Sequence, residues 1–311
     1  MNPRRQRFAD FLFRSTTRLF AFAVLLLLGA VMVALLIGGM PAFRAFGISF
    51  LWSETWNPVK QIFGGAPAIY GTLITSLIAM LIGVPLALGV AMFLTELCPP
   101  MLRRPIGILI ELLAAIPSII YGIWGLFVLA PFLQLTVQPF LKGTIGDIPL
   151  IGVLFSGPPL GLGVLTAGFI LAVMVLPFIA AVTRDVFLTV PPMLRESAYG
   201  IGLTTAEVVR EIVLPYTRIG VVGGVMLGLG RALGETMAVT FVIGNAHRIS
   251  PSLLAPGTTI SATLANEFSE AVGQLYTSSL ILLGFILFII TCAVLAAAKL
   301  LLLRLDQQAA K

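Results

Sequence analysis

Hydrophobic residues along this 311-residue chain gather into long, nearly uninterrupted runs separated by shorter polar stretches. A helix that crosses a bilayer needs ~20 mostly apolar residues, and each run reaches that length. We therefore predict six membrane-spanning helices. Their expected bounds are about 19–40, 70–95, 106–130, 160–182, 219–244 and 279–303. An even number of spans places both ends of the chain on the same side of the membrane.

Composition supports this interpretation and excludes the other broad classes. Hydrophobic residues make up 59% of the chain and charged residues only 10%, whereas a soluble domain carries roughly 25% charged residues. The chain is too hydrophobic to be intrinsically disordered. Its two cysteines, Cys98 and Cys292, are too few to staple a disulfide scaffold of this length. The predicted fold class is therefore an all-α integral membrane protein.

The distribution of basic residues predicts the orientation. Fourteen of the 19 lysines and arginines fall in segments on the side of the N-terminus, four fall in the opposite loops, and Arg231 lies within the fifth span. Cytoplasmic loops carry an excess of Lys and Arg, so we predict that both termini are cytoplasmic. The first run lacks the A-x-A site that follows a signal peptide, and we interpret it as an uncleaved anchor.

The cytoplasmic loop 184–218 holds much of the charge of the chain and has a helical pattern of its own. Pro192 suits the first turn of a helix, which Gly202 would end. Thr204 or Thr205 can cap a second helix, and Pro215 is expected to end it. The loop is thus predicted to form a short helix–turn–helix with an apolar face, a shape that fits a groove on a partner.

Six residues of this loop match a known pattern. The spacing E-x-A-x-x-x-G, nine residues, then I-x-L-P resembles the coupling-loop signature of ABC importer membrane subunits, although Ser197 replaces the usual first alanine. The matching residues are Glu196, Ala198, Gly202, Ile212, Leu214 and Pro215. The resemblance implies that the loop docks on an ATPase subunit and passes its closure to the membrane helices. An ordinary amphipathic linker is the alternative.

A nucleotide site would carry a sequence signature of its own. The chain contains no G-x-x-x-x-G-K-[ST] phosphate-binding loop. We therefore expect a transport subunit rather than an enzyme, without a cofactor, and with ATP hydrolysis on a separate subunit.

The fifth predicted span carries two charges among regularly spaced glycines. At ~100° per residue, one face of a helix would hold Gly220, Gly224, Gly228, Arg231 and Glu235. Glycines four residues apart allow close helix packing, and charges at i and i+4 can meet. Charged residues inside a bilayer are costly, so they face the bundle interior and are functional candidates.

Arg231 is the stronger of the two candidates because a guanidinium keeps its charge and offers a fork of donors to a tetrahedral oxyanion. We predict that Arg231 receives a phosphate-like anion. Glu235 is expected to hold Arg231 in place while the site is empty, and so to gate it. A buried Arg–Glu pair that only locks helices together is the alternative.

The stretch around these charges, G-L-G-R-A-L-G-E-T-M-A-V-T, closely resembles the fifth helix of the C-type permease subunit of Pst phosphate importers. Further similar stretches are L-L-A-A-I-P-S at 112–118, L-T-E-L at 94–97 and A-N-E-F at 265–268. The resemblance covers nearly the whole chain and is denser after Tyr70. It implies a type I ABC importer (MetI-like) bundle, inorganic phosphate as the substrate, and a transport role for Arg231 and Glu235.

The same resemblance implies partners and a domain organisation. The partners are a second, A-type permease, a dimer of ATP-binding subunits, a periplasmic phosphate-binding protein and the lipid of the cytoplasmic (inner) membrane, with no nucleic acid. Residues 1–68 would hold the cytoplasmic N-terminus, the first span and the first outer loop. Residues 69–300 would form the ABC importer transmembrane core, and 301–311 a cytoplasmic tail.

Glu111 is a third charged candidate because it falls inside the predicted third span. We expect it to be neutral or paired with an arginine of another chain, with a role in the substrate pathway. Pro117, six residues later, is expected to kink that helix.

Residues of the outer loops give weaker signals. Trp52 and Trp56 fit an aromatic belt at the membrane interface. His247, the only histidine, is expected to lie on the surface. Glu267 and its polar neighbours are expected to form a solvated face, with contact to a binding protein as the alternative.

Three other functions stay open at this point. The same architecture suits another oxyanion, such as molybdate, sulfate or phosphonate. An ATP-independent channel or secondary transporter would also account for charges inside a span, although not for the loop signature. A membrane scaffold that only anchors a partner is a third possibility.

Overall fold

The computed structural model describes residues 3–146, 148 and 152–309. This part of the chain is built from helices, and its only β-bridge joins Asn57 to Ile62. The helices are α1 Pro3–Phe46, α2 Ala66–Met92, α3 Pro100–Ala114, α4 Ser118–Trp124, α5 Ala130–Phe132, α6 Gln138–Ile145, α7 Val164–Leu188, α8 Pro192–Gly200, α9 Thr205–Val208, α10 Leu214–Gly234, α11 Met237–Thr240, α12 Ile260–Glu267 and α13 Gln274–Ala309.

Six helical segments in the described residues are long and apolar enough to cross a membrane, which confirms the predicted number. They are Asp10–Leu51, Ala66–Leu97, Ser118–Thr144, Val164–Leu188, Thr205–Gly234 and Gln274–Leu300. Of the basic residues used to predict the orientation, Lys311 lies outside the described residues, as do the side chains of Arg4, Arg5, Arg7 and Arg304.

The third span differs from its predicted bounds. The apolar run 106–130 is divided by a turn at residues 115–117, so that the amphipathic α3 precedes the turn and the span proper begins at Ser118. Pro117 has an extended backbone (φ −56°, ψ 136°) at this point and starts α4. A proline cannot continue the hydrogen-bond ladder of the preceding helix, so the expected kink is a full break.

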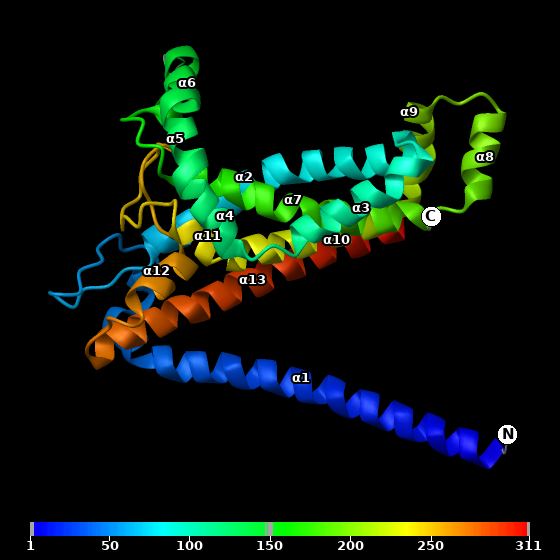
Figure 1. Ribbon diagram of the computed structural model, residues 1–311. Helices are drawn as coiled ribbons and strands as arrows, with labels where there is room; N and C mark the ends of the chain where they lie inside the picture. Colours follow the sequence, from blue (N-terminus) through cyan, green and yellow to red (C-terminus); the bar gives the residue numbers. More distant parts are fainter. Residues whose placement is uncertain (1–2, 147, 149–151, 310–311) are drawn as a thin grey trace.

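α7 lies at the centre of the bundle and packs against α2, α10 and α3 (Figure 1). Its sequence is apolar on nearly all sides, as expected of a helix surrounded by others, and two thirds of its most apolar stretch is buried. Three glycines of α10 allow it to pack closely against α7. An added Cβ at Gly220, Gly224 or Gly228 would lie 2.5–2.9 Å from side-chain atoms of α7.

α1 and α13 form a second, peripheral layer. They meet near the C-terminal end of α1 and diverge toward its N-terminus (Figure 1). At the contact, the Ser278 hydroxyl donates to the Gly38 carbonyl and accepts from the Ala42 amide, both at 2.9 Å. The side chains in the most apolar stretch of α1 are not buried within this chain, so this helix faces lipid or a partner.

Both chain ends lie at the same end of the bundle, together with α8 and α9 (Figure 1). The opposite end carries α6, α12 and the long connecting loops. This arrangement separates the loop with the coupling signature from the outer loops by the length of the spans.

Wide, five-residue π-helical turns precede three prolines within helical segments. They cover Gly125–Leu129, Leu133–Val137 and Val209–Val213, ahead of Pro131, Pro139 and Pro215. A wide turn accommodates the proline ring and the missing amide hydrogen bond. The expectation that Pro215 ends its helix is therefore wrong, because helix continues from Thr205 to Gly234.

Candidate functional site

The fifth span stops short of its predicted end, within the stretch that carries the two charges. α10 ends at Gly234, and Glu235 has an extended backbone (φ −68°, ψ 131°) before α11 begins at Met237. Arg231 therefore lies on the last turn of α10, whereas Glu235 lies beyond it. The prediction of one helix continuing to Gly244, with both charges on one face, is wrong.

Glu235 makes a local contact instead of an ion pair with Arg231. Its Oε1 accepts a hydrogen bond from the Ala238 amide at 3.3 Å. The first amides of a helix lack partners within the helix, and a side-chain oxygen can satisfy one of them. Within the described residues no ion pair joins Arg231 to a carboxylate. Glu235 therefore holds the start of α11 rather than Arg231.

Arg231 is half-buried and keeps donors available. Its Nε is buried and has no hydrogen-bond partner, and its guanidinium carbon lies 5.8 Å from the centre of the Phe178 ring, within the range of a cation–π contact. Its charge also acts on Tyr121 of α4. A buried donor without a partner costs free energy, and within the described residues no group of this chain satisfies it. An anion at Arg231 stays a prediction.

The two broken helices meet beside this arginine. The Tyr121 hydroxyl donates to the Leu113 carbonyl at 2.8 Å and so bridges the break between α3 and α4. α4 packs closely on α11, because an added Cβ at Gly122 would lie 2.8 Å from the Phe241 ring and 3.1 Å from the Ala238 Cα. Broken helices of this kind place backbone polar groups along transport pathways.

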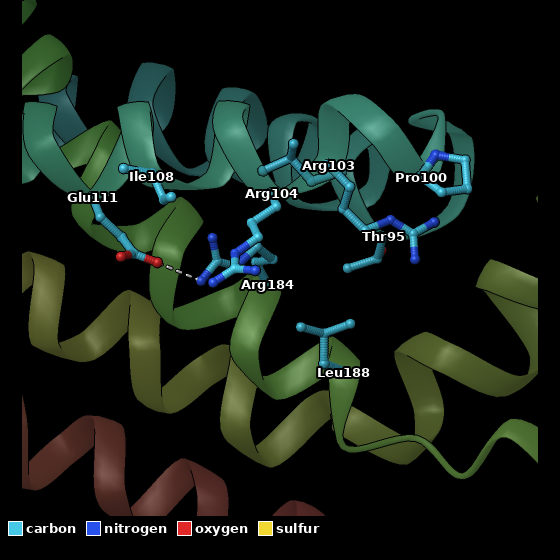
Figure 2. A pocket seen from close by; sticks show the side chains of 9 residues that line it. Thr95, Pro100, Arg103, Arg104, Ile108, Glu111, Arg184 and Leu188 are labelled. Carbon is cyan, nitrogen blue, oxygen red and sulfur yellow. Dashed lines mark hydrogen bonds and ion pairs between the residues drawn. The ribbon is translucent and has the colours of Figure 1, made fainter.

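Glu111 belongs to α3 and precedes the third span, so the premise that it lies inside a span is wrong. Its Oε1 lies 2.6 Å from Nη2 of Arg184 at the end of α7 (Figure 2). The partner is thus in the same chain, not in another one. A pathway role for Glu111 stays a prediction.

The loop 184–218 folds into the expected helix–turn–helix. α8 begins at Pro192, and Gly202 ends the turn with φ +92°, a conformation that favours glycine. The Thr204 hydroxyl accepts from the Glu207 amide, while the Glu207 carboxylate accepts from the Thr204 amide at 2.8 Å. This reciprocal capping box confirms Thr204, rather than Thr205, as the cap.

One salt bridge joins this loop to the membrane helices. Arg195 Nη2 lies 3.1 Å from Glu96 Oε1 in the turn after α2, and donates to the Phe187 carbonyl of α7 at 2.7 Å. The Glu96 side chain is only 5% exposed. Ala198 packs into an apolar cluster with Phe187 and Val213 below these contacts. Sequence reasoning missed Arg195, although it directly precedes the signature residue Glu196.

Some apolar side chains of the loop 184–218 are exposed. Met193 is 77% exposed and Ile201 81% exposed. These residues lie on α8 and the turn after it, away from the buried Ala198. The loop thus combines a fixed base with a free apolar surface, as a docking element requires.

The outer end holds a second, part-buried polar cluster, centred on Glu267. Its carboxylate accepts from the Trp56 indole at 2.7 Å and from the Tyr276 hydroxyl at 2.7 Å, and lies 2.6 Å from His247 Nε2. Trp56 and His247 stack with ring centres 5.2 Å apart, and Phe63 stacks on Tyr276. We refer to these five residues as the outer cluster.

The outer cluster corrects two expectations. Glu267 is hydrogen-bonded within the chain rather than on a solvated face, and His247 is paired with it, with only 19% of its side chain exposed. A belt of Trp52 and Trp56 at the membrane interface stays a prediction. Burial alone would raise the pKa of Glu267. The hydrogen bonds from His247 and Tyr276 and the charge of His247 outweigh burial and hold this pKa below its usual value.

Comparison with known families gives one match across most of the chain. Residues 83–307 match the family described as binding-protein-dependent transport system inner membrane component. This range begins in α2 and includes both broken helices, the loop 184–218 and most of α13.

Curated relatives match at high identity. A phosphate transport system permease protein PstC of Mesorhizobium japonicum is 65% identical over 303 residues, covering 97% of this chain and 93% of the relative. A protein of the same name in Haemophilus influenzae is 53% identical, covering 98% and 97%. A probable one in Methanocaldococcus jannaschii is 37% identical, covering 86% of each.

Solved structures give a similar fold at low identity. A bacterial alginate ABC transporter in complex with an alginate-bound periplasmic protein has a chain that matches with a TM-score of 0.60 at 18% identity, covering 94% of both chains. The inward-facing MetNI methionine ABC transporter matches with a TM-score of 0.55 at 18% identity, covering 76% of this chain and 94% of that one. At such identity these likenesses concern the fold alone.

Proposed function

The chain belongs to the family of binding-protein-dependent transport system inner membrane components, and from this premise we propose that it is a permease subunit of an ATP-driven importer of inorganic phosphate. It is a multi-pass inner-membrane transport component and not an enzyme. Phosphate is supported by the names of relatives that are 65% and 53% identical over nearly the full chain. The single observation that carries the proposal is Arg231, a half-buried cation with free donors beside two broken helices.

Arg231 binds the phosphate anion as it crosses the bundle. Phosphate presents tetrahedral oxygens that a guanidinium can bind with two hydrogen bonds, and the absence of a carboxylate partner within the described residues keeps those donors free. Glu235 fixes α11 beside this position, so it sets the shape of the path rather than the charge of Arg231.

The conformational change of the ATP-binding subunits reaches this chain through the loop 184–218. The exposed Met193 and Ile201 contact the ATP-binding subunit, and Glu196 lies on the same helix as Met193. Arg195 passes the displacement to Glu96 and to the end of α7. Ile212, Leu214 and Pro215 continue it into α10, because helix runs without interruption from the loop to Arg231.

The complete importer contains further subunits. An A-type permease supplies the other half of the pathway, two ATP-binding subunits dock on the loop, and a periplasmic phosphate-binding protein docks on the outer end. Both termini are cytoplasmic in this arrangement. Residues 69–300 act as the transport core, with α1 as an added peripheral helix.

Uptake of labelled phosphate by the reconstituted importer tests the proposal. Phosphate should compete with the label, whereas molybdate, sulfate and a phosphonate in equal amount should not. Equal competition by molybdate contradicts phosphate as the substrate. Uptake that persists without the ATP-binding subunit contradicts ATP-driven import and favours a channel or a secondary transporter.

A further inference from the structure

A hollow of about 420 Å³ opens between α3 and the end of α7, away from Arg231. Three arginines and one carboxylate lie in its wall, namely Arg103, Arg104, Arg184 and Glu111. Figure 2 shows Arg104 reaching into the hollow from α3 and Arg184 from α7. Nothing in the phosphate path described above uses this hollow, which lies at the end of the bundle that carries α8.

Arg184 forms the fixed part of the hollow. It lies 2.6 Å from Glu111 and 2.8 Å from Asp185, and its side chain is 16% exposed. The buried Gly107 lets the guanidinium lie against α3, since an added Cβ there would be 2.4 Å from Arg184 Nη1. Two carboxylates therefore already neutralise Arg184.

Arg103 and Arg104, unlike Arg184, have no carboxylate of the described chain beside them to neutralise their charge. Neither makes an ion pair within the described residues. The Nε of Arg103 is buried without a hydrogen-bond partner, and its Nη2 reaches only the Cys98 carbonyl, at 3.5 Å. Two cations with free donors in the wall of one hollow attract an anion. The attraction of the hollow for an anion thus comes from this pair.

The rest of the wall is apolar. Ile108 is 48% exposed and Leu188 50% exposed at the mouth of the hollow, and Leu109 and Leu112 on the neighbouring faces of α3 are about 60% exposed. A basic hollow bordered by exposed apolar helix surface fits a charged headgroup whose acyl chains lie along the helix. Basic pockets between membrane helices on the cytoplasmic side bind anionic lipid headgroups.

We propose that the Arg103–Arg104 hollow binds a phosphate group, presented either by an anionic phospholipid headgroup or by free inorganic phosphate. Its place in the cytoplasmic leaflet rests on the orientation given under the proposed function, whereas the binding itself does not. The guanidinium pair supplies the hydrogen bonds, Glu111 holds Arg184 in the wall, and the apolar rim favours the lipid source.

Two binding assays on the purified full-length chain test the proposal. One measures dioleoyl phosphatidylglycerol against phosphatidylcholine in nanodiscs, and the other measures radiolabelled inorganic phosphate by equilibrium dialysis. The test variant is R103Q/R104Q. The matched control is R14Q/R18Q, which removes two exposed charges from α1, at the N-terminal end, outside the hollow. If the double variant does not fold, R104Q alone replaces it, because Arg104 has no partner to lose.

A lipid source predicts one saturable phosphatidylglycerol site per chain, weakened about tenfold or more in R103Q/R104Q and by less than about twofold in R14Q/R18Q. A free-phosphate source predicts that R103Q/R104Q loses one phosphate site per chain that R14Q/R18Q retains. Either result supports the site. The proposal is overturned if R103Q/R104Q binds both probes as the unaltered chain does, or if R14Q/R18Q weakens lipid binding equally. Neither result depends on transport, so a failure here leaves the proposed function standing.

Discussion

The two ends of the bundle are held together by different chemistry. At the end with α8 and α9, separate ion pairs each join two segments, as Arg195 of α8 joins Glu96 after α2 and Arg184 of α7 joins Glu111 of α3. At the outer end one carboxylate, Glu267, collects hydrogen bonds from three separate segments of the chain.

This difference suits the two ends to different tasks. At the first end, Ala91, Phe187 and Ala198 also share one apolar cluster, so the loop 184–218 is joined to the ends of α2 and α7 by apolar packing as well as by ion pairs. At the outer end, loss of one carboxylate releases the first outer loop, the loop after α11 and the start of α13 together. Under the proposed function, the first end transmits a displacement and the second holds the outer loops in a single arrangement.

Arg195→Gln should have the largest effect on stability. It leaves the buried Glu96 carboxylate without its counter-charge, and breaking a buried pair in this way costs about 3–5 kcal/mol. We expect faster amide hydrogen exchange in α8 and α9 and the loss of ATP-driven uptake. Arg210→Gln is the matched control, because the Arg210–Glu211 pair is exposed and such pairs contribute at most about 1 kcal/mol. Equal effects of the two variants would contradict the transmitting role of Arg195.

Glu267→Gln should destabilise the outer end by on the order of 2–3 kcal/mol, since hydrogen bonds to a charged group contribute about 1.5–3 kcal/mol each and the amide keeps only part of them. Hydrogen exchange should rise in α12 and at the start of α13 but not in α8. Glu270→Gln, at an exposed position three residues away, should change little. A rise at both ends would show that the ends are not independent.

The outer cluster also predicts a dependence on pH. The pKa of Glu267 is lower in the folded chain than in the unfolded one, so its stabilisation is fully present above the ordinary carboxylate pKa of about 4.3. It is lost as the pH falls through the lowered folded value. Fluorescence of Trp56 in a W52F/W124F background should therefore show an acid transition below about pH 4. E267Q should not show this acid transition.

Thr204→Ala should have the smallest effect of the four. Loss of a threonine cap costs about 1 kcal/mol, and it should appear as faster exchange of the first amides of α9. Thr205→Ala at the neighbouring position removes no capping contact and serves as the control. Equal exchange in the two variants would contradict the assigned cap.

The sequence predicted local features of both ends and missed the distant ones. The six spans follow from hydropathy, and a cap at Thr204 or Thr205 follows from local sequence, with Thr204 chosen only by the structure. The outer cluster does not, because Trp56 and Glu267 are 211 residues apart and nothing local brings them together. The break at Glu235 was hidden for another reason. Apolar residues continue on both sides of it, so hydropathy alone cannot mark the point where the helix ends.

Arg231 lies between the two ends, and the proposed transport function depends on it. Arg231→Lys keeps the charge but removes the fork of donors that binds an oxyanion with two hydrogen bonds. Phosphate uptake by the reconstituted importer, measured with the assembly of the subunits, should fall about tenfold or more while the complex stays intact. Unchanged uptake in an intact complex would contradict anion recognition at Arg231.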